Sequence, residues 1–182
     1  MSVEVAEIDK RHLVVIRQSV ERFVDEMARQ FDRADAVLLD VAPQIYRGAK
    51  ASFSKAAVRT LDIDPESKAD YIADLCKDNS NLIRRSSFDF VFCTEVLEHS
   101  VNPFAAVNEI HRILKVDGLL FLTTPFNFRI HGPLPDCWRF TEHGLRALLA
   151  RYEVRALHEV PTPDRPLMPI HYRVVARKAN EE

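Results

Sequence analysis

The segment 87–126 constrains the fold of this chain more than any other part of its sequence. It opens with a short apolar run over 88–93, rich in aromatic and β-branched residues, as expected of a buried strand. Asn102 and Pro103 then favour a helix start, as N-cap and first helical residue, and a second apolar run follows at 119–123. Strand, helix and strand within about 40 residues predict a right-handed βαβ unit of a parallel sheet. The helix is expected to bury a stripe formed by Phe104, Val107, Ile110 and Leu114.

Further segments supply the other elements of such a sheet. Apolar residues recur at helical spacing over 9–32, which predicts an amphipathic helix that either packs on the sheet or covers the site as a lid. Thr141 is expected to N-cap a later helix. The apolar stripe of that helix would be formed by Leu145, Leu148, Leu149 and Tyr152. The remaining strands are expected at 36–41, 57–62, 70–75, 154–160 and 171–176.

The bulk properties are those of one ordinary globular domain of 182 residues. A net charge of −2 without a strongly basic block argues against nucleic acid as the main partner. No apolar segment approaches the about 20 residues that would span a bilayer. The cysteines Cys76, Cys93 and Cys137 are far apart, which favours reduced thiols and a cytoplasmic location. The oligomeric state is left open.

The motifs FDFVFCTEVLEH, ILKVDG and TTPF occur in this order and resemble the second half of class I S-adenosylmethionine-dependent methyltransferases. The later HGPLPDCWRFTEHGLRALL resembles a bacterial subgroup associated with glycan or small-metabolite pathways. The resemblance covers about residues 36–177. It implies a single α/β domain over 1–182 with a Rossmann-like, seven-stranded, mostly parallel sheet and helices on both faces. It also implies S-adenosylmethionine as donor, no metal, and a small-molecule or glycan-related acceptor.

The first strand ends in Asp40, where the family continues with a glycine-rich loop. Here Ala42 and Gln44 occupy the glycine positions, with Pro43 between them. Alanine disfavours positive φ and proline fixes its own φ, so we expect this loop to follow a different path. A dinucleotide needs a glycine turn with its pyrophosphate at a helix N-terminus, which argues against NAD or FAD. S-adenosylmethionine has no phosphate, so a site that binds it depends less on the glycines of this loop.

Acidic residues close the next two predicted strands as well. Asp62 lies 22 residues after Asp40, where a carboxylate, as a double acceptor, suits two ribose hydroxyls. The alternative is a capping or turn role, since Asp64 and Pro65 follow. The resemblance implies that Asp74 binds the amino group of adenine, and that the backbone N–H of the next residue donates a hydrogen bond to a ring nitrogen. The donor-binding candidates are Asp40, Ala42, Asp62, Ile63, Asp74, Leu75 and Thr94.

Ligands of an open parallel sheet bind beyond the carboxyl ends of its strands, which directs attention to 94–99. Glu95 and His99 are four residues apart, so on a helical turn they would share one face, and a His–carboxylate pair can act as general base. Alternatively, Glu98 and His99 brace the end of the sheet. A zinc site is not expected, because no second His or Cys occurs at ligand spacing.

The loop after the strand at 119–123 offers acceptor contacts, since loops at this edge usually set substrate choice. His131 and Asp136 are candidates, and Trp138 would line the pocket. The equally weighted alternative pairs Asp136 with Arg139 and places Trp138 in the core. The catalytic candidates are Glu95, His99 and His131.

Together these features predict methyl transfer from S-adenosylmethionine to a small-molecule or sugar acceptor. The sulfonium methyl is already activated, so the protein mainly aligns the acceptor with it and excludes water. The alternative is a degenerate methyltransferase fold that serves as a binding or interaction module. The altered glycine loop and the compact size of the chain support that alternative.

Overall fold

The computed structural model describes residues 4–43 and 48–179, which build a seven-stranded sheet in the order β3-β2-β1-β4-β5-β7-β6. The pairs β1–β2, β1–β4, β2–β3 and β4–β5 are parallel, whereas β7 runs antiparallel to β5 and β6. The predicted Rossmann-like, mostly parallel sheet is therefore confirmed. The strands are β1 (Val37–Val41), β2 (Ala57–Asp62), β3 (Tyr71–Ile72), β4 (Phe88–Thr94), β5 (Leu114–Pro125), β6 (Tyr152–Val160) and β7 (His171–Lys178).

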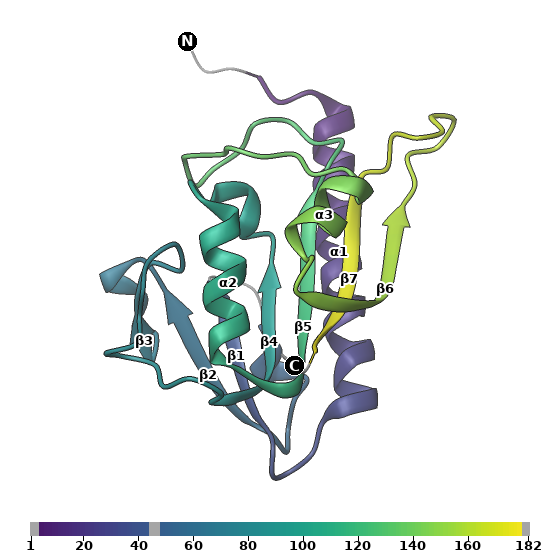
Figure 1. The fold of residues 1–182 in the computed structure, drawn as a ribbon. Helices are drawn as coiled ribbons and strands as arrows, with labels where there is room; N and C mark the ends of the chain where they lie inside the picture. The colour runs from purple at the N-terminus through teal and green to yellow at the C-terminus, as the bar shows by residue number, and fades with distance from the viewer. Residues whose placement is uncertain (1–3, 44–47, 180–182) are drawn as a thin grey trace.

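Helices cover both faces of the sheet (Figure 1). The long helix α1 (Glu7–Phe31) lies on one face, and α2 (Pro103–Ile113) and α3 (Glu142–Leu148) lie on the other. Asn102 and Thr141 are N-caps as predicted, because their side chains accept hydrogen bonds from the N–H groups of Ala105 and Gly144 at 3.1 Å. Short 3-10 helices occur at Ala49–Ala51 (η1), Pro65–Ser67 (η2) and Leu97–His99 (η3).

An aromatic cluster joins α1 to the sheet. The ring of Phe23 lies edge-on to Phe92 and Phe121, with centroids 6.4 and 6.3 Å away, and those two rings are 4.7 Å apart. Alternation along β4 and β5 places these phenylalanines on the same face of the sheet. The helix predicted at 9–32 thus packs on the sheet. Its first half also reaches the carboxyl edge, where His12 Nδ1 lies 3.0 Å from the carbonyl oxygen of Asn127.

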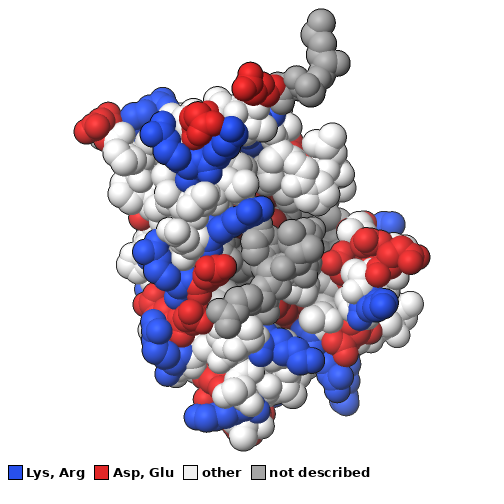
Figure 2. All heavy atoms as spheres, turned by 180° about the vertical axis from the view of Figure 1, so that it is seen from behind, with Lys and Arg blue, Asp and Glu red and all other residues white. Residues whose placement is uncertain are grey.

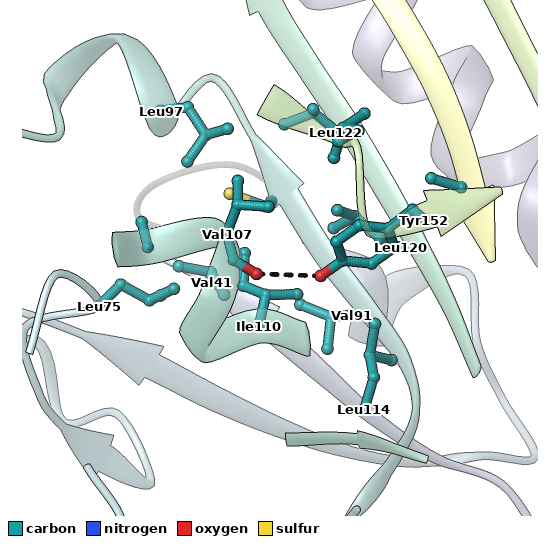
Figure 3. Packing of buried hydrophobic residues seen from close by; sticks show 14 of the residues in the cluster. Val41, Leu75, Val91, Leu97, Val107, Ile110, Leu114, Leu120, Leu122 and Tyr152 are labelled. Carbon is teal, nitrogen blue, oxygen red and sulfur yellow. Dashed lines mark hydrogen bonds between the residues drawn. The ribbon is translucent and has the colours of Figure 1, made fainter. Parts of the chain in front are cut away.

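Aliphatic side chains fill the space between the sheet and α2 (Figure 3). Val107 and Ile110 of the predicted stripe are buried against Leu120 and Leu122 of β5. Tyr152, at the start of β6, donates a hydrogen bond from its hydroxyl to the carbonyl of Val107 at 3.0 Å. This bond satisfies the one polar atom that the tyrosine carries into an apolar core.

Several predicted element bounds are wrong, each for a local reason. Phe104 is 58% exposed rather than part of the buried stripe, whereas its neighbour Pro103 and, one turn further on, Val107 are buried. Leu114 belongs to β5, where it pairs with Phe88, and Tyr152 belongs to β6. The strand predicted at 70–75 has only two residues. The chain turns immediately afterwards, as the Asp74 carboxylate accepts a hydrogen bond from the N–H of Cys76 at 2.9 Å.

The outer surface that includes α1 carries acidic and basic side chains side by side (Figure 2). One ion pair across this region joins Arg173 of β7 to Glu26 of α1 at 3.9 Å. Among the described residues, no helix has both the length and the apolar character needed to cross a membrane.

The aromatic cluster yields a test of the core. Phe121 is fully buried, so we expect Phe121→Ala to lower the free energy of unfolding by about 3–5 kcal/mol through lost contacts and a residual cavity. Phe104→Ala, at an exposed position of the same residue type, should change it by less than about 0.5 kcal/mol. Urea denaturation of both variants measures the difference, and equal losses would contradict this packing.

Candidate functional site

The carboxyl ends of three neighbouring parallel strands meet at one edge of the sheet. β1 lies between β2 and β4, with Val41 opposite Leu61 on one side and Cys93 on the other. From β1 the chain first moves outward through β2 and β3, and then returns to continue through β4 and β5. This reversal is the topological switch point at which open α/β sheets bind ligands.

Asp40 holds the loop that follows β1. Its side chain is buried, and its Oδ2 atom accepts a hydrogen bond from the N–H of Ala49 at 2.6 Å. Burial raises the pKa of Asp40 to about 6, although the bond from Ala49 opposes this change. The carboxylate thus ties the end of β1 to η1, at the far side of the loop.

The prediction that Ala42 would force the loop onto a different path is wrong at this residue. Ala42 has φ of 50°, the left-handed conformation that favours glycine, and its N–H donates to the carbonyl of Leu61 at 2.7 Å. An alanine adopts it at a cost of about 1–2 kcal/mol. Gly48 closes the loop, also with positive φ, at 60°. Gln44, the second altered glycine position, lies outside the described residues.

Asp62 ends β2 beside this loop and is 7% exposed. Its Oδ1 atom accepts a hydrogen bond from the N–H of Asp64 at 3.0 Å, so the turn role considered as an alternative is present. Within the described part of the chain, its Oδ2 atom has no such partner and remains available to a ligand. The next residue, Ile63, places an apolar side chain in solvent, 67% exposed.

Asp74 and Leu75 follow β3 rather than lying within it. The carboxylate of Asp74 is used partly by the N–H of Cys76, and Lys77 Nζ lies 3.8 Å from its other oxygen. The side chain of Leu75 is buried in the core. Ala73, just before them, donates to the carbonyl of Asp62 at 2.9 Å. The two segments that carry Asp62 and Asp74 therefore lie side by side.

Glu95 and His99 do not share a helical face as predicted. Glu95 has φ of 54° at the turn after Thr94, and its carboxylate lies 3.3 Å from Nδ1 of His171. His171 is fully buried and was missed by sequence reasoning. It is the first residue of β7, and since β7 is antiparallel, its start rather than its end lies at the carboxyl edge. The strand expected at 171–176 was the signal in the sequence. Because this strand pairs antiparallel to β5, its first residue, His171, lies opposite Pro125 at this edge.

His99 instead meets His131, with ring centroids 4.8 Å apart, and both face Glu98. The Nε2 atoms of His99 and His131 lie 3.9 and 4.0 Å from Glu98 Oε1. Sequence spacing gave no second ligand for a metal, but folding brings one from the loop after β5. Burial raises the pKa of the Glu98 carboxyl, and the nearby charge of Glu95 adds to this; burial also lowers the pKa of His131.

The segment between β5 and α3 passes over the carboxyl ends of the central strands (Figure 1). Arg139 donates to both carboxylate oxygens of Asp136, at 2.6 and 2.7 Å. Burial alone would raise the pKa of Asp136, but the bonds from Arg139 and from the N–H of His131 lower it to about 2. The predicted Asp136–Arg139 pair is confirmed. Trp138 is 40% exposed, stacks on Phe140 and donates to the carbonyl of Ser100 at 2.8 Å.

The parallel sheet with its switch point defines an open α/β fold, and comparison with known proteins identifies its kind. Residues 19–122 match the family described as "Methyltransferase domain", and the chain belongs to this family. A ubiquinone biosynthesis O-methyltransferase of Xanthomonas oryzae pv. oryzae is 32% identical over 91 residues, which are 50% of this chain and 34% of the relative. The chain therefore spans about a third of the length of that relative.

Solved structures share the fold at low sequence identity. A SAM-dependent methyltransferase from Methanosarcina mazei has a TM-score of 0.66 and 19% identity, covering 85% of this chain and 98% of that one. The cyclase SpnF has a TM-score of 0.68 and 16% identity, covering 90% of this chain and 83% of that one. The fold is thus that of SAM-dependent methyltransferases, and proteins named for another reaction also use it.

Asp40 gives a pH-dependent test of the loop. Its pKa is about 6 in the folded protein and near 3.8 when unfolded, so its contribution to stability is fully present below about pH 4 and lost as pH rises through 6. The stability of the wild type relative to Asp40→Asn should fall by about 2.5 kcal/mol between pH 4 and pH 7. Asp35→Asn, at an exposed aspartate, is the control. Urea denaturation across this range measures both, and a pH-independent difference for Asp40→Asn would contradict the assignment.

Proposed function

We propose that this chain is a methyltransferase that binds S-adenosylmethionine across the carboxyl ends of β1, β2 and β4 and transfers its methyl group to a hydroxyl of a small-molecule acceptor. The observation that carries the proposal is Asp62, a buried carboxylate with one oxygen held by the N–H of Asp64 and the other available at the switch point. Membership of the methyltransferase domain family supports it.

The nucleoside half of the donor is assigned to the neighbouring ends of β2 and β3. Asp62 Oδ2 accepts hydrogen bonds from the ribose hydroxyls, and the exposed side chain of Ile63 packs against the adenine. Asp74 and the backbone N–H of Leu75 contact the edge of the adenine. These assignments are supported by the bond between Ala73 and Asp62, which keeps the two segments adjacent.

The methionine half of the donor is assigned to the loop after β1. Ala42 has a left-handed backbone directly after the strand, and Asp40 accepts a hydrogen bond from Ala49 on the far side of the loop. Thr94 at the end of β4 lines the opposite wall. The positive φ of Ala42 shows that an alanine can adopt the backbone conformation that favours glycine at this position, which removes one part of the support for a degenerate binding module.

The acceptor end is assigned to Glu95 with His171 behind it, 3.3 Å away. The acceptor hydroxyl gives its proton to the Glu95 carboxylate, and its oxygen attacks the methyl carbon of the sulfonium. The new O–C bond forms as the C–S bond breaks, and the bonding pair stays on sulfur to give S-adenosylhomocysteine. His99 and His131 are assigned to the same side of the site, near the acceptor.

Oxygen is proposed as the accepting atom because the curated relatives are named O-methyltransferases. A hydroxyl keeps its proton at neutral pH and therefore needs a general base, which a carboxylate next to a buried histidine can supply. A deprotonated amine is already a nucleophile and needs no such base. The loop between β5 and α3, which carries His131 and the half-exposed Trp138, would select the acceptor.

Calorimetric titration with S-adenosylmethionine tests the donor site. We expect micromolar binding by the wild type and a loss of about 10-fold to 100-fold in Asp62→Asn, since hydrogen bonds to a charged group contribute about 1.5–3 kcal/mol. The matched control is Asp64→Asn, an exposed aspartate two residues away whose capping bond an asparagine can still accept. Absence of binding at millimolar donor would favour the interaction module, and equal affinities of the two variants would remove Asp62 from the site.

A further inference from the structure

Glu98 carries a fully buried carboxylate that has no hydrogen-bond donor among the other described residues. Its residue is 0% exposed, and neither carboxylate oxygen accepts a hydrogen bond from another described residue. Its own backbone carbonyl accepts bonds from the N–H groups of Cys137 and Trp138, at 2.6 and 3.1 Å, so the residue is held firmly in place. A buried carboxylate without partners is costly, and it requires either a proton or a cation.

Two histidines present nitrogen atoms to this carboxylate. His99 lies next to Glu98 in η3, and His131 comes from the segment between β5 and α3. One ligand atom from each of the three residues can be chosen so that all lie within 4.8 Å of one another. Both imidazoles are largely shielded, with side chains 15% and 22% exposed.

The outer nitrogen of each ring is bound to an acceptor, which fixes the direction of the inner one. His99 Nδ1 lies 3.0 Å from the carbonyl oxygen of Pro135. His131 Nδ1 is hydrogen-bonded to the carbonyl oxygen of Arg129 at 3.3 Å and also lies 3.1 Å from Asp136 Oδ2. An acceptor at Nδ1 places the proton there and leaves a lone pair on Nε2. Two lone pairs and a carboxylate then face one another. Without a cation between them, these electron-rich groups repel one another. Metal sites use the same arrangement, in which each histidine ligand is oriented by an acceptor on its other nitrogen.

A further layer of bonds keeps these acceptors in position. Arg139 holds Asp136 through both carboxylate oxygens and also donates to the carbonyl of Arg129 at 2.8 Å. Asp136 in turn accepts from the N–H of His131 at 2.9 Å. The segment that delivers His131 is therefore tied at several points, and the approach of the second histidine to Glu98 is built into the fold.

We propose that Glu98, His99 and His131 bind a divalent first-row transition-metal ion such as Zn²⁺. One carboxylate and two imidazoles are a donor set typical of such ions, and three protein ligands leave a coordination position open. Tetrahedral coordination at about 2.1 Å would place the ligand atoms about 3.4 Å apart. The two nitrogens, now 3.9 and 4.0 Å from Glu98 Oε1, would need to approach it by roughly 0.5–0.6 Å, and the set of three, now within 4.8 Å, would need to contract by up to about 1.4 Å.

The metal role in catalysis rests on the proposed function, whereas metal binding does not. An ion at this position lies near enough to Glu95 for the charge of Glu95 to act on the Glu98 carboxyl, at the side of the sheet assigned to the acceptor. An acceptor hydroxyl in the open coordination position would lose its proton more readily, because a bound cation stabilises the oxyanion. The proposed acceptor class is therefore a phenol or alcohol whose oxygen can coordinate a metal ion.

The test is metal binding by the tag-free full chain after removal of metals with a chelator. Co²⁺ serves as the probe, because its visible absorption reports both stoichiometry and coordination, and competition with Zn²⁺ gives the affinity for Zn²⁺. We expect one equivalent per chain, and a loss of affinity of at least about 100-fold in Glu98→Gln and in His131→Gln. The control is His143→Gln, an exposed histidine of α3, which should bind as the wild type does.

A positioning variant separates a built site from chance contacts. Asp136→Asn removes the negative charge that lies 3.1 Å from His131 Nδ1 and should reduce Co²⁺ affinity by about 10-fold to 100-fold with the same absorption spectrum. Each variant is first checked for wild-type circular dichroism and for binding of S-adenosylmethionine. Donor binding without Co²⁺ binding by the wild type at millimolar ion would overturn the metal site alone. Co²⁺ binding without donor binding would overturn the transferase alone. Equal Co²⁺ affinity in the wild type and Glu98→Gln would remove these residues from any metal site.

Discussion

Parallel pairing of β1 with β2 on one side and β4 on the other is the constraint on which the rest of the structure depends. Strands that run the same way in close register end together, so the acids that close them gather at one edge. The antiparallel β7 contributes to this edge by its first residue, His171. The proposed donor site is therefore a consequence of topology more than of the loop after β1, whose sequence departs from the family pattern.

Much of this fold was predictable because its signals are local. The βαβ unit follows from two apolar runs around a helix, and the caps Asn102 and Thr141 need only the N–H groups of their own first turn. Prediction failed where a side chain competes with the backbone. Asp74 bonds to the N–H of Cys76 and ends β3 after two residues, which no apolar pattern reveals.

The candidate site was predictable only in its acids at strand ends. Residue preference alone suggested that Ala42 would avoid positive φ, yet the pairing around it imposes that conformation. The approach of His131 to Glu98 depends on a long connection held by Asp136 and Arg139, and spacing along the chain carries no record of it. A carboxylate in the sequence between Leu97 and His99 gives no sign that it is fully buried.

The crystal structure of the chain with S-adenosylhomocysteine tests the central claim most directly. The account predicts the ribose hydroxyls within hydrogen-bonding distance of Asp62 Oδ2, the adenine beside Asp74 and Leu75, and the sulfur directed toward Glu95. A nucleoside bound elsewhere, with Asp62 Oδ2 still without a partner, would contradict the account.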